Sequence, residues 1–197
     1  MAADQTTICN LALAHLGKAS IMSLDDRTPE AALCNRFYDQ TRDEVLQSHP
    51  WNFAIKRATL SLLADAPAFG WAYQYQLPSD CLRILQLNGY QVYQADGRFD
   101  IEGGRMMTNC DTAQVRYIAR VTDGTLFPPL FVEALALKLA TRLAKPITGS
   151  ASEVERLKTE YERITKPLAM RMDAAEGKPL VKLPWANSRF VRARFGG

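Results

Sequence analysis

The apolar residues of this chain change their spacing along its length, and this change limits the fold more than any other feature of the sequence. In the first 50 residues and again in residues 128–175 they recur at steps of three and four, which is typical of helices with one buried face. Between them large residues alternate with polar ones, which is typical of half-buried strands. We therefore expect helices at both ends of the chain and short strands in the middle.

Capping residues predict where the first two helices begin and end. The segment "DQTTICNLALAHLG" finishes at Gly17, where a left-handed C-terminal cap belongs. In residues 28–50, Thr28 is a suitable N-cap, Pro29 fits the first turn, and Pro50 prevents the helix from continuing. Each segment should therefore form one helix, with a loop between the two.

Two more helices are expected after the strands. Residues 128–146 are bracketed by prolines and are apolar around most of the helix circumference, so this helix should be central to a bundle. The last helix, residues 150–175, opens with a capping box formed by Ser152 and Glu155, and Pro167 should kink it. The expected buried side of this helix consists of Val154, Leu157, Tyr161, Ile164, Leu168 and Met172.

Turn signals divide the middle of the chain into short segments. They are "NGY" at residues 88–90, "ADGRF" at residues 95–99 and "EGG" at residues 102–104. Trp51 and Phe53 directly follow the proline that stops the second helix. We expect both aromatic side chains to be buried where the helices meet the strands.

These patterns together predict a mainly α protein with some α+β character. Its centre would be a four-helix bundle made by two separate parts of the chain, residues 1–52 and 122–177. Residues 53–121 would form a β-rich insertion in that bundle. Residues 178–197, "KPLVKLPWANSRFVRARFGG", would follow the last helix as an extended C-terminal arm, because Pro179 and Pro184 prevent a helix there.

The positive charge of the chain is concentrated in the C-terminal arm. The whole sequence has 24 basic and 21 acidic residues, and a net charge of +3. Five of the basic residues and none of the acidic ones lie in the arm, so the remaining body has 19 basic against 21 acidic residues, a net charge of −2. Such asymmetry indicates an interaction tail rather than a nucleic-acid-binding domain.

Within the arm, basic residues alternate with apolar ones in "SRFVRARF", which is a strand pattern. A purely electrostatic arm would not need the apolar partners, so docking on another protein is favoured over contact with DNA. Tryptophan and arginine are also the residue types that most often dominate protein interfaces. The predicted interface residues are Trp185, Arg189, Phe190, Arg192, Arg194 and Phe195.

Residues that could support catalysis are few. His15 lies on the apolar face of the first helix, where a structural histidine is the plainer interpretation, and His49 would bond the last carbonyls of the second helix. Asp25, Asp26 and Arg27 could imitate an acid pair with a cation, but a solvated loop before an N-cap is the plainer interpretation. We predict that the protein is not an enzyme, and a hydrolase using His15 or His49 is the weaker alternative.

No metal or cofactor site is expected. Asp96, Asp100 and Glu102 lack the remaining ligand positions of a calcium loop, and the sequence has no phosphate-binding glycine motif. The four cysteines are far apart and form no C-x-x-C pair, so we interpret them as reduced, structural thiols of a protein made in a reducing, cytoplasm-like compartment. They are Cys9, Cys34, Cys81 and Cys110. No stretch has the length and apolar character of a membrane span.

Several segments resemble one family when they are taken in order. They are "ICNLALAHLGKASIMSLDD", "SHPWNFAIKRATL", "YQYQLPSDCLRIL" and "LFPPLFVEALALKLATRLAKPITGS". Together they resemble the tail tubular protein A, or head-to-tail adaptor, family of short-tailed bacteriophages, over about residues 6–175. The turn from Pro50 to Phe53 and the strand entry "LPSDCLRIL" are the most specific pieces. The resemblance does not extend into the C-terminal arm.

The resemblance implies a structural virion protein at the head–tail junction, built on a helical bundle with a β-rich insertion. Such adaptors assemble as a ring, a dodecamer, beneath the portal protein, receive the tail nozzle protein below, and leave a channel through which DNA passes. No cofactor or active site comes with the family. The near-neutral to acidic body suits a channel wall that must not hold phosphates.

Two alternatives stay open at this stage. The chain could instead be a DNA-contacting packaging or regulatory protein that uses its basic arm on phosphates. If it is an adaptor, the arm could dock on the portal rim or on an adjacent adaptor subunit, and the portal rim is favoured.

Overall fold

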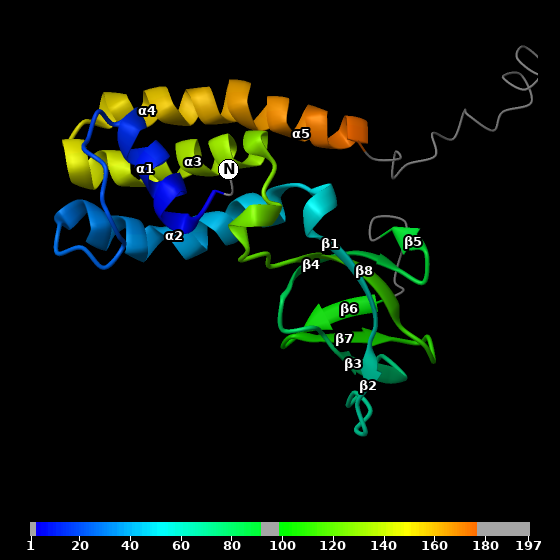
Figure 1. Ribbon diagram of the computed structural model, residues 1–197. Coiled ribbons are helices and arrows are strands. Elements are labelled where there is room, and N and C mark those ends of the chain that lie inside the picture. Colours follow the sequence, from blue (N-terminus) through cyan, green and yellow to red (C-terminus); the bar gives the residue numbers. More distant parts are fainter. Residues whose placement is uncertain (1–2, 92–98, 177–197) are drawn as a thin grey trace, which may run out of the picture.

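The helices pack together on one side of the molecule and the strands on the other (Figure 1). The computed structural model describes residues 3–91 and 99–176. The helical region comprises α1 (Gln5–His15), α2 (Pro29–Ser48), α3 (Pro129–Thr148), α4 (Ala151–Glu160), a π-helical turn η4 (Tyr161–Thr165) and α5 (Lys166–Glu176). Two short 3₁₀ turns, η1 (Asn52–Ala54) and η3 (Gly124–Leu126), lie where the chain passes between the two regions.

The predicted ends of α2 are confirmed. The Thr28 hydroxyl accepts a hydrogen bond from the amide of Ala31 at 3.2 Å, and Pro29 occupies the first turn. The helix ends at Ser48, and His49 is extended because the ring of Pro50 disfavours helical geometry in the residue before it. α1 is capped in the same way by Asp4, and Gly17 follows it with a φ of 66°.

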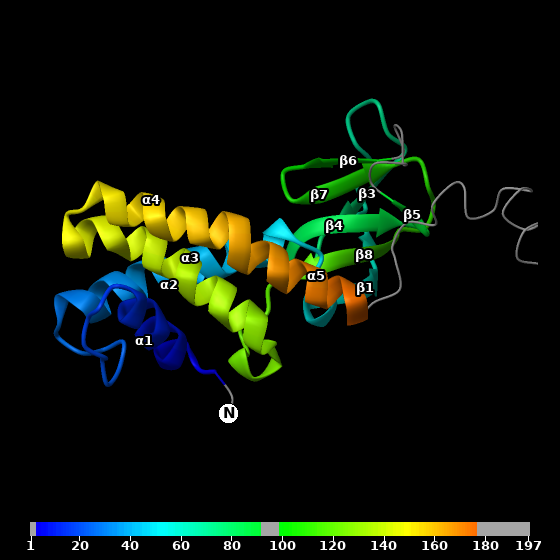
Figure 2. The same cartoon turned by 90° about the horizontal axis from the view of Figure 1, so that it is seen from above.

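The central position predicted for α3 is also confirmed. In Figure 1 α3 lies between α2 and the rod formed by α4, η4 and α5, and in Figure 2, seen from above, α3 crosses in front of α2. Phe131, Leu135 and Leu139 are buried in the helical core together with many of its alanines. The predicted end at Pro146 is wrong, because the helix continues to Thr148 and stops at Gly149, which has a φ of 69°.

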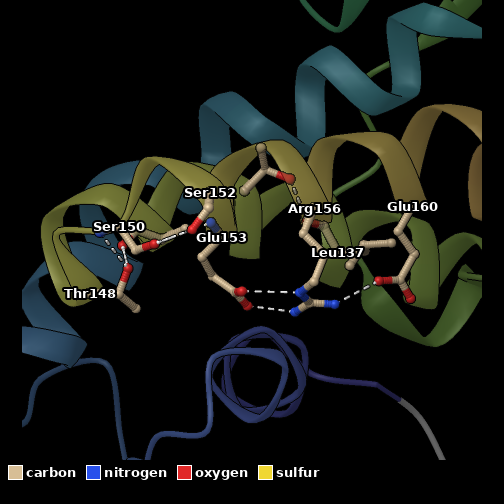
Figure 3. Close-up of polar contacts among 9 residues, drawn as sticks. Leu137, Thr148, Ser150, Ser152, Glu153, Arg156 and Glu160 are labelled. Atoms are coloured by element: carbon tan, nitrogen blue, oxygen red, sulfur yellow. Dashed lines mark hydrogen bonds and ion pairs between the residues drawn. The ribbon is translucent and has the colours of Figure 1, made fainter.

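The N-cap of α4 lies two residues before the predicted one. Ser150, not Ser152, is the N-cap, and its hydroxyl accepts the amide of Glu153 at 3.3 Å (Figure 3). Ser152 contacts the Ser150 hydroxyl instead. The guanidinium of Arg156 then bridges Glu153 and Glu160 along one exposed face of the helix, at spacings of three and four residues.

The strands form two antiparallel sheets of four strands each. One sheet has the order β1-β8-β4-β5 and the other β2-β3-β7-β6. Their bounds are β1 (Ile55–Thr59), β2 (Ser61–Leu62), β3 (Tyr73–Gln76), β4 (Cys81–Leu87), β5 (Tyr90–Gln91), β6 (Phe99–Glu102), β7 (Arg105–Thr108) and β8 (Gln114–Ala119).

Two of the predicted turns are hairpins in the structure. Asn88 and Gly89, both with positive φ, join β4 to β5, so that Leu87 pairs with Tyr90. Two glycines with positive φ, residues 103 and 104, join β6 to β7 in the same manner. The third predicted turn, residues 95–99, lies mostly outside the described residues.

The β region has a hydrophobic core of its own. Side chains from both sheets meet in it, as Tyr75 and Met106 do with Val115. The buried members are Leu60, Tyr75, Ile84, Leu87, Met106, Ala113, Val115, Tyr117 and Ala119. The two sheets therefore hold together by burying apolar side chains between them.

The predicted fold class is wrong. We expected a mainly α four-helix bundle with a β-rich insertion and an extended arm, whereas the structure has a mixed α+β fold in which two four-stranded antiparallel sheets enclose a second core. The helical periodicity was the stronger signal, but the alternating segments contain enough inward-facing apolar residues to close a core without the helices. The domain boundaries at residues 52, 53, 121 and 122 stay a prediction, and residues 178–197 lie outside the described residues.

Candidate protein-interaction surface

The structure describes the surface from which the C-terminal arm departs, not the arm. α5 ends at Glu176, the last residue described. All six predicted interface side chains lie beyond it: Trp185, Arg189, Phe190, Arg192, Arg194 and Phe195. Their role stays a prediction, and the neighbouring surface of α5 is the part of this region that the structure can characterise.

A π-helical turn separates α4 from α5. The amide of Lys166 donates to the carbonyl of Tyr161, five residues back instead of four. Pro167 follows at once, and proline has no amide hydrogen and its ring collides with the carbonyl four residues back in a regular helix. The disturbance predicted at Pro167 therefore takes the form of an extra residue in the turn before it.

The extra residue changes which side of the helix is buried. Leu157 and Tyr161 are buried before the turn, and Ala169 is buried after it. In a helix without the extra residue, Leu168 would continue the buried side, because one residue corresponds to a rotation of about 100°. The prediction that Ile164, Leu168 and Met172 are buried with the rest is wrong for this reason.

Those three side chains form an exposed apolar stripe along η4 and α5. The exposed fractions are 63% for Ile164, 44% for Leu168 and 48% for Met172. They follow one another at steps of four residues, so they share one face of the helix. Single exposed apolar residues are common on protein surfaces, whereas an apolar row on one helix is typical of an interaction site.

The apolar stripe continues into a pocket at the end of α5. Met172 is a member of both, and the pocket has a volume of about 170 Å³. Its walls come from three parts of the chain: the turn after α2, the start of α3 and the last turns of α5. The lining residues include Trp51, Pro128, Pro129, Phe131, Met172 and Glu176. The pocket thus adjoins the residue after which the arm begins.

Asp173 fixes the end of α5 against the turn that follows α2. One carboxylate oxygen accepts a hydrogen bond from the His49 ring at 3.1 Å, and the other accepts the amide of Asn52 at 2.9 Å. The Asn52 side chain also donates to the backbone carbonyl of Asp173. We call these three residues the Asp173 clamp. The clamp sets the position at which the chain leaves the helical region.

The environment of His49 favours the neutral imidazole. Burial lowers the pKa of His49, and the charges of Arg83 and Lys166 add to this effect, which together outweigh the attraction of the Asp173 carboxylate. Since a carboxylate only accepts hydrogen bonds, the ring nitrogen that faces Asp173 must be the one that carries the hydrogen. The predicted bond from His49 to the last carbonyls of α2 is replaced by this contact with α5.

Charged side chains line the other side of the π-helical turn. Glu44 on α2 binds Lys138 on α3 at 2.9 Å and also binds Arg142. Burial opposes the charge on Glu44, but its hydrogen bonds to the two cations lower its pKa nonetheless. The ammonium group of Lys138 lies 5.2 Å from the centre of the Tyr161 ring, and burial raises the pKa of Tyr161 to about 12. These contacts hold the turn in place between α2 and α3.

No family model matches this chain, and no curated protein matches it either. The family resemblance thus stays an expectation based on the sequence segments quoted above. The apolar stripe, the pocket and the Asp173 clamp are the features from which a function can be proposed.

The remaining candidate residues from the sequence have structural contacts. The His15 ring lies 3.1 Å from a carboxylate oxygen of Glu133 and so joins α1 to α3. Asp26 accepts the amides of Met22 and Ser23, which closes the loop before α2, and Asp25 donates its amide to the Ser23 hydroxyl. The structure does not bring these groups together with the Asp173 clamp.

The acidic and cysteine residues form no metal site in the part of the chain that is described. Within residues 3–91 and 99–176, no three histidine, cysteine or acidic side chains gather where they could hold a metal ion. Asp100 accepts a hydrogen bond from the Trp71 indole, and Asp96 lies outside the described residues. All four cysteines are free thiols, two of them buried. Every helix described is too short or too polar to span a lipid bilayer.

Sequence inspection missed the apolar stripe and the clamp for different reasons. Pro167 is visible in the sequence, and a shift of the buried side after an in-helix proline could have been considered. The clamp joins residues more than 120 positions apart, and no local pattern indicates such a contact.

Proposed function

We propose that this protein is a structural adaptor of a bacteriophage virion, which forms a ring and joins the portal protein to the tail nozzle protein. The ring is a dodecamer, it lines the channel through which DNA passes, and it is found at the head–tail junction after synthesis in the host cytoplasm. The protein is not an enzyme and needs no cofactor in this role. The order of the four family-like segments supports the proposal from the sequence.

The observation that carries the proposal is the exposed apolar stripe. A single chain leaves three large apolar side chains exposed along η4 and α5. Covering them against a neighbouring subunit would remove apolar surface from water, which stabilises association by ~25 cal/mol per Å² of that surface. We assign the stripe to the contact between neighbouring subunits of the ring, and the arm that begins nearby to the portal.

The stripe is tested with a pair of matched variants. Leu168→Glu places a charge in the stripe, whereas Met22→Glu places one on a loop side chain that is 91% exposed and lies far from it in the sequence. Both proteins should fold, because neither side chain belongs to the core. Each is mixed with the portal protein, and the products are measured by sedimentation and viewed by negative-stain electron microscopy.

We expect annular complexes from the parent chain and from Met22→Glu, but not from Leu168→Glu. If both variants assemble equally well, the stripe is not part of the contact between ring subunits. If the parent chain sediments unchanged with portal protein and instead binds duplex DNA tightly at physiological salt, the adaptor proposal fails and the DNA-contacting alternative replaces it.

A further inference from the structure

Two arginines lie side by side on the outer face of the β1-β8-β4-β5 sheet. Arg57 on β1 and Arg116 on β8 are direct partners in the strand register, so their side chains leave the sheet on the same face. Gln86 on β4 is the partner of Arg116 on its other side. Ile118, two residues along β8 on this face, belongs to the helical core. The arginine pair therefore lies on the part of the face that extends beyond the helices.

A pocket of about 510 Å³ is lined by both arginines. No acidic side chain lines it among the described residues. The polar residues of its walls are Arg57, Thr59, Gln86, Asn88, Gln114 and Arg116. Asn88 supports the wall of the pocket, since its side chain donates to the carbonyl of Thr112 and accepts the amide of Gln114.

One nitrogen of the Arg116 guanidinium has no hydrogen-bond acceptor among the described residues. Its Nε atom is buried, and within the part of the chain that the structure describes it has no hydrogen-bond partner. Burial lowers the pKa of the Arg116 guanidinium, and the charge of Arg57 lowers it further. A guanidinium has five N–H donors in a fixed fork. A buried donor without an acceptor lowers the stability of the folded chain.

Two cations close to this pair have carboxylate partners, whereas the described residues give no ion pair for Arg57 or Arg116. Lys56, next to Arg57, binds Asp80 at 2.8 Å, and Arg120 beyond the end of β8 binds Asp43 at 2.7 Å. Like charges that face each other across two strands destabilise a sheet unless an anion lies between them. The described residues supply no such anion, so an anion from outside the chain would offset the charge of both arginines.

We propose that the Arg57–Arg116 pocket binds carboxylate groups of an acidic segment on a partner protein. The guanidinium fork matches a carboxylate with two parallel hydrogen bonds, and two adjacent arginines suit a segment with consecutive acidic residues. A nucleic acid backbone would need a row of cations along its length, whereas this pocket presents two. The proposal does not depend on the adaptor role, because it rests on the pocket alone.

The probe for this site is tetraglutamate, with tetraglutamine as the uncharged control. Binding is measured by calorimetry at about 20 mM salt, where screening of the charges is weak. Amide chemical shifts of the isotope-labelled full chain then locate the peptide. We expect shifts in β1, β8 and the β4–β5 turn with tetraglutamate and none with tetraglutamine.

Two pocket variants and one matched control complete the test. Arg57→Gln and Arg116→Gln should each weaken tetraglutamate binding about tenfold, since each removes a charge-assisted fork. Arg36→Gln removes the same charge from an exposed position on α2 and should change the affinity less than about twofold. Arg57 is exposed, so its replacement should leave the melting temperature unchanged and keeps the test valid if Arg116→Gln unfolds.

Three results would overturn the proposal. The first is that the parent chain does not bind tetraglutamate, and the second is that Arg36→Gln weakens binding as much as Arg57→Gln. The third is tighter binding of inorganic phosphate or of a short DNA duplex at the same residues, which would assign the pocket to phosphate groups instead.

Discussion

At the scale of single residues, Trp51 holds the turn that follows α2 in the helical core. Its side chain is 1% exposed, and its indole nitrogen donates to the carbonyl of Val45 at 2.9 Å. The indole ring meets the His49 and Phe131 rings edge to face, at centroid distances of 4.7 and 5.1 Å. The predicted burial of Trp51 is confirmed, and Phe53 is partly buried in the same aromatic cluster.

Replacing Trp51 by alanine should destabilise the protein by roughly 3–5 kcal/mol, because the change leaves a cavity among aromatic rings and removes a buried hydrogen bond. Urea unfolding of the parent and the variant measures this difference. Trp71→Ala is the matched control, because Trp71 is only partly buried and lies in a loop, and it should cost clearly less. A Trp51→Ala protein that melts within about two degrees of the parent would contradict the prediction.

His49 should make the stability of the protein depend on pH. Its pKa in the folded chain lies below the ordinary value of 6.5, so the unfolded chain takes up the proton first as the solution is acidified. The contribution of His49 is therefore complete above pH 6.5 and is lost as the pH falls from there through the folded-state pKa. His49 alone cannot change the free energy of unfolding by more than about 1.4 kcal/mol per pH unit.

Unfolding free energies measured between about pH 7 and pH 5 test this, because the pKa values of most carboxyl groups lie below that window. His49→Gln keeps a donor for Asp173 but does not titrate, so its stability should fall less with acidification than that of the parent. If the unfolding free energy of His49→Gln falls with acidification as steeply as that of the parent, His49 is not the source of the pH dependence.

At the scale of elements, one extra residue in the rod formed by α4, η4 and α5 changes which side chains are exposed. The π-helical turn before Pro167 moves the buried side onto Ala169 and leaves the apolar stripe outside. The N-cap of the rod is Ser150 and not the predicted Ser152, because Ser150 has the extended backbone of an N-cap with φ of −91° and ψ of 119°.

The two serines can be distinguished by mutation. Ser150→Ala should destabilise the protein by about 1 kcal/mol, because the amide of Glu153 loses its acceptor at the start of α4. Ser152→Ala should change the unfolding free energy by less than about 0.5 kcal/mol, since an exposed serine inside a helix is readily replaced by alanine. Chemical denaturation resolves such differences, and a larger loss for Ser152→Ala would restore the cap predicted from the sequence.

At the scale of the whole molecule, we expect the two cores and the arm to have different roles. The helical core and the β core are each closed within residues 3–176, apart from the segment 92–98. The arm adds five positive charges to a body with a net charge of −2. If the adaptor proposal holds, stability belongs to the body, and attachment to the portal protein belongs to the arm.

Deletion of residues 178–197 should therefore leave the melting temperature unchanged and weaken docking on the portal protein. Within the arm, Trp185→Ala should weaken docking at every salt concentration, because the lost contact is apolar. Arg192→Ala and Arg194→Ala should matter mainly at low salt, where charges are less screened. Sedimentation with portal protein measures docking of the truncated chain and of each variant. If the truncated chain docks as well as the full one, the arm does not attach the protein to the portal.

The sequence by itself determined the local features of this protein. The Thr28 cap, the stop at Pro50, the turn at Asn88 and Gly89, and the burial of Trp51 all follow from residues within a few positions of one another. Backbone geometry at such places depends on local sterics and on short-range hydrogen bonds, so a local pattern suffices to predict it. The same reasoning recovered the helices and the strands as elements.

Only the tertiary structure decided the surfaces on which a function can be based. The buried side of α5, the meeting of Asp173 with His49 and the pairing of Arg57 with Arg116 each depend on how distant segments pack or align. The closure of two sheets around a second core, which corrected the fold class, depends on such packing as well. Packing and strand register are set by the sum of many contacts between segments far apart in the chain, and no local spacing of residues specifies that sum.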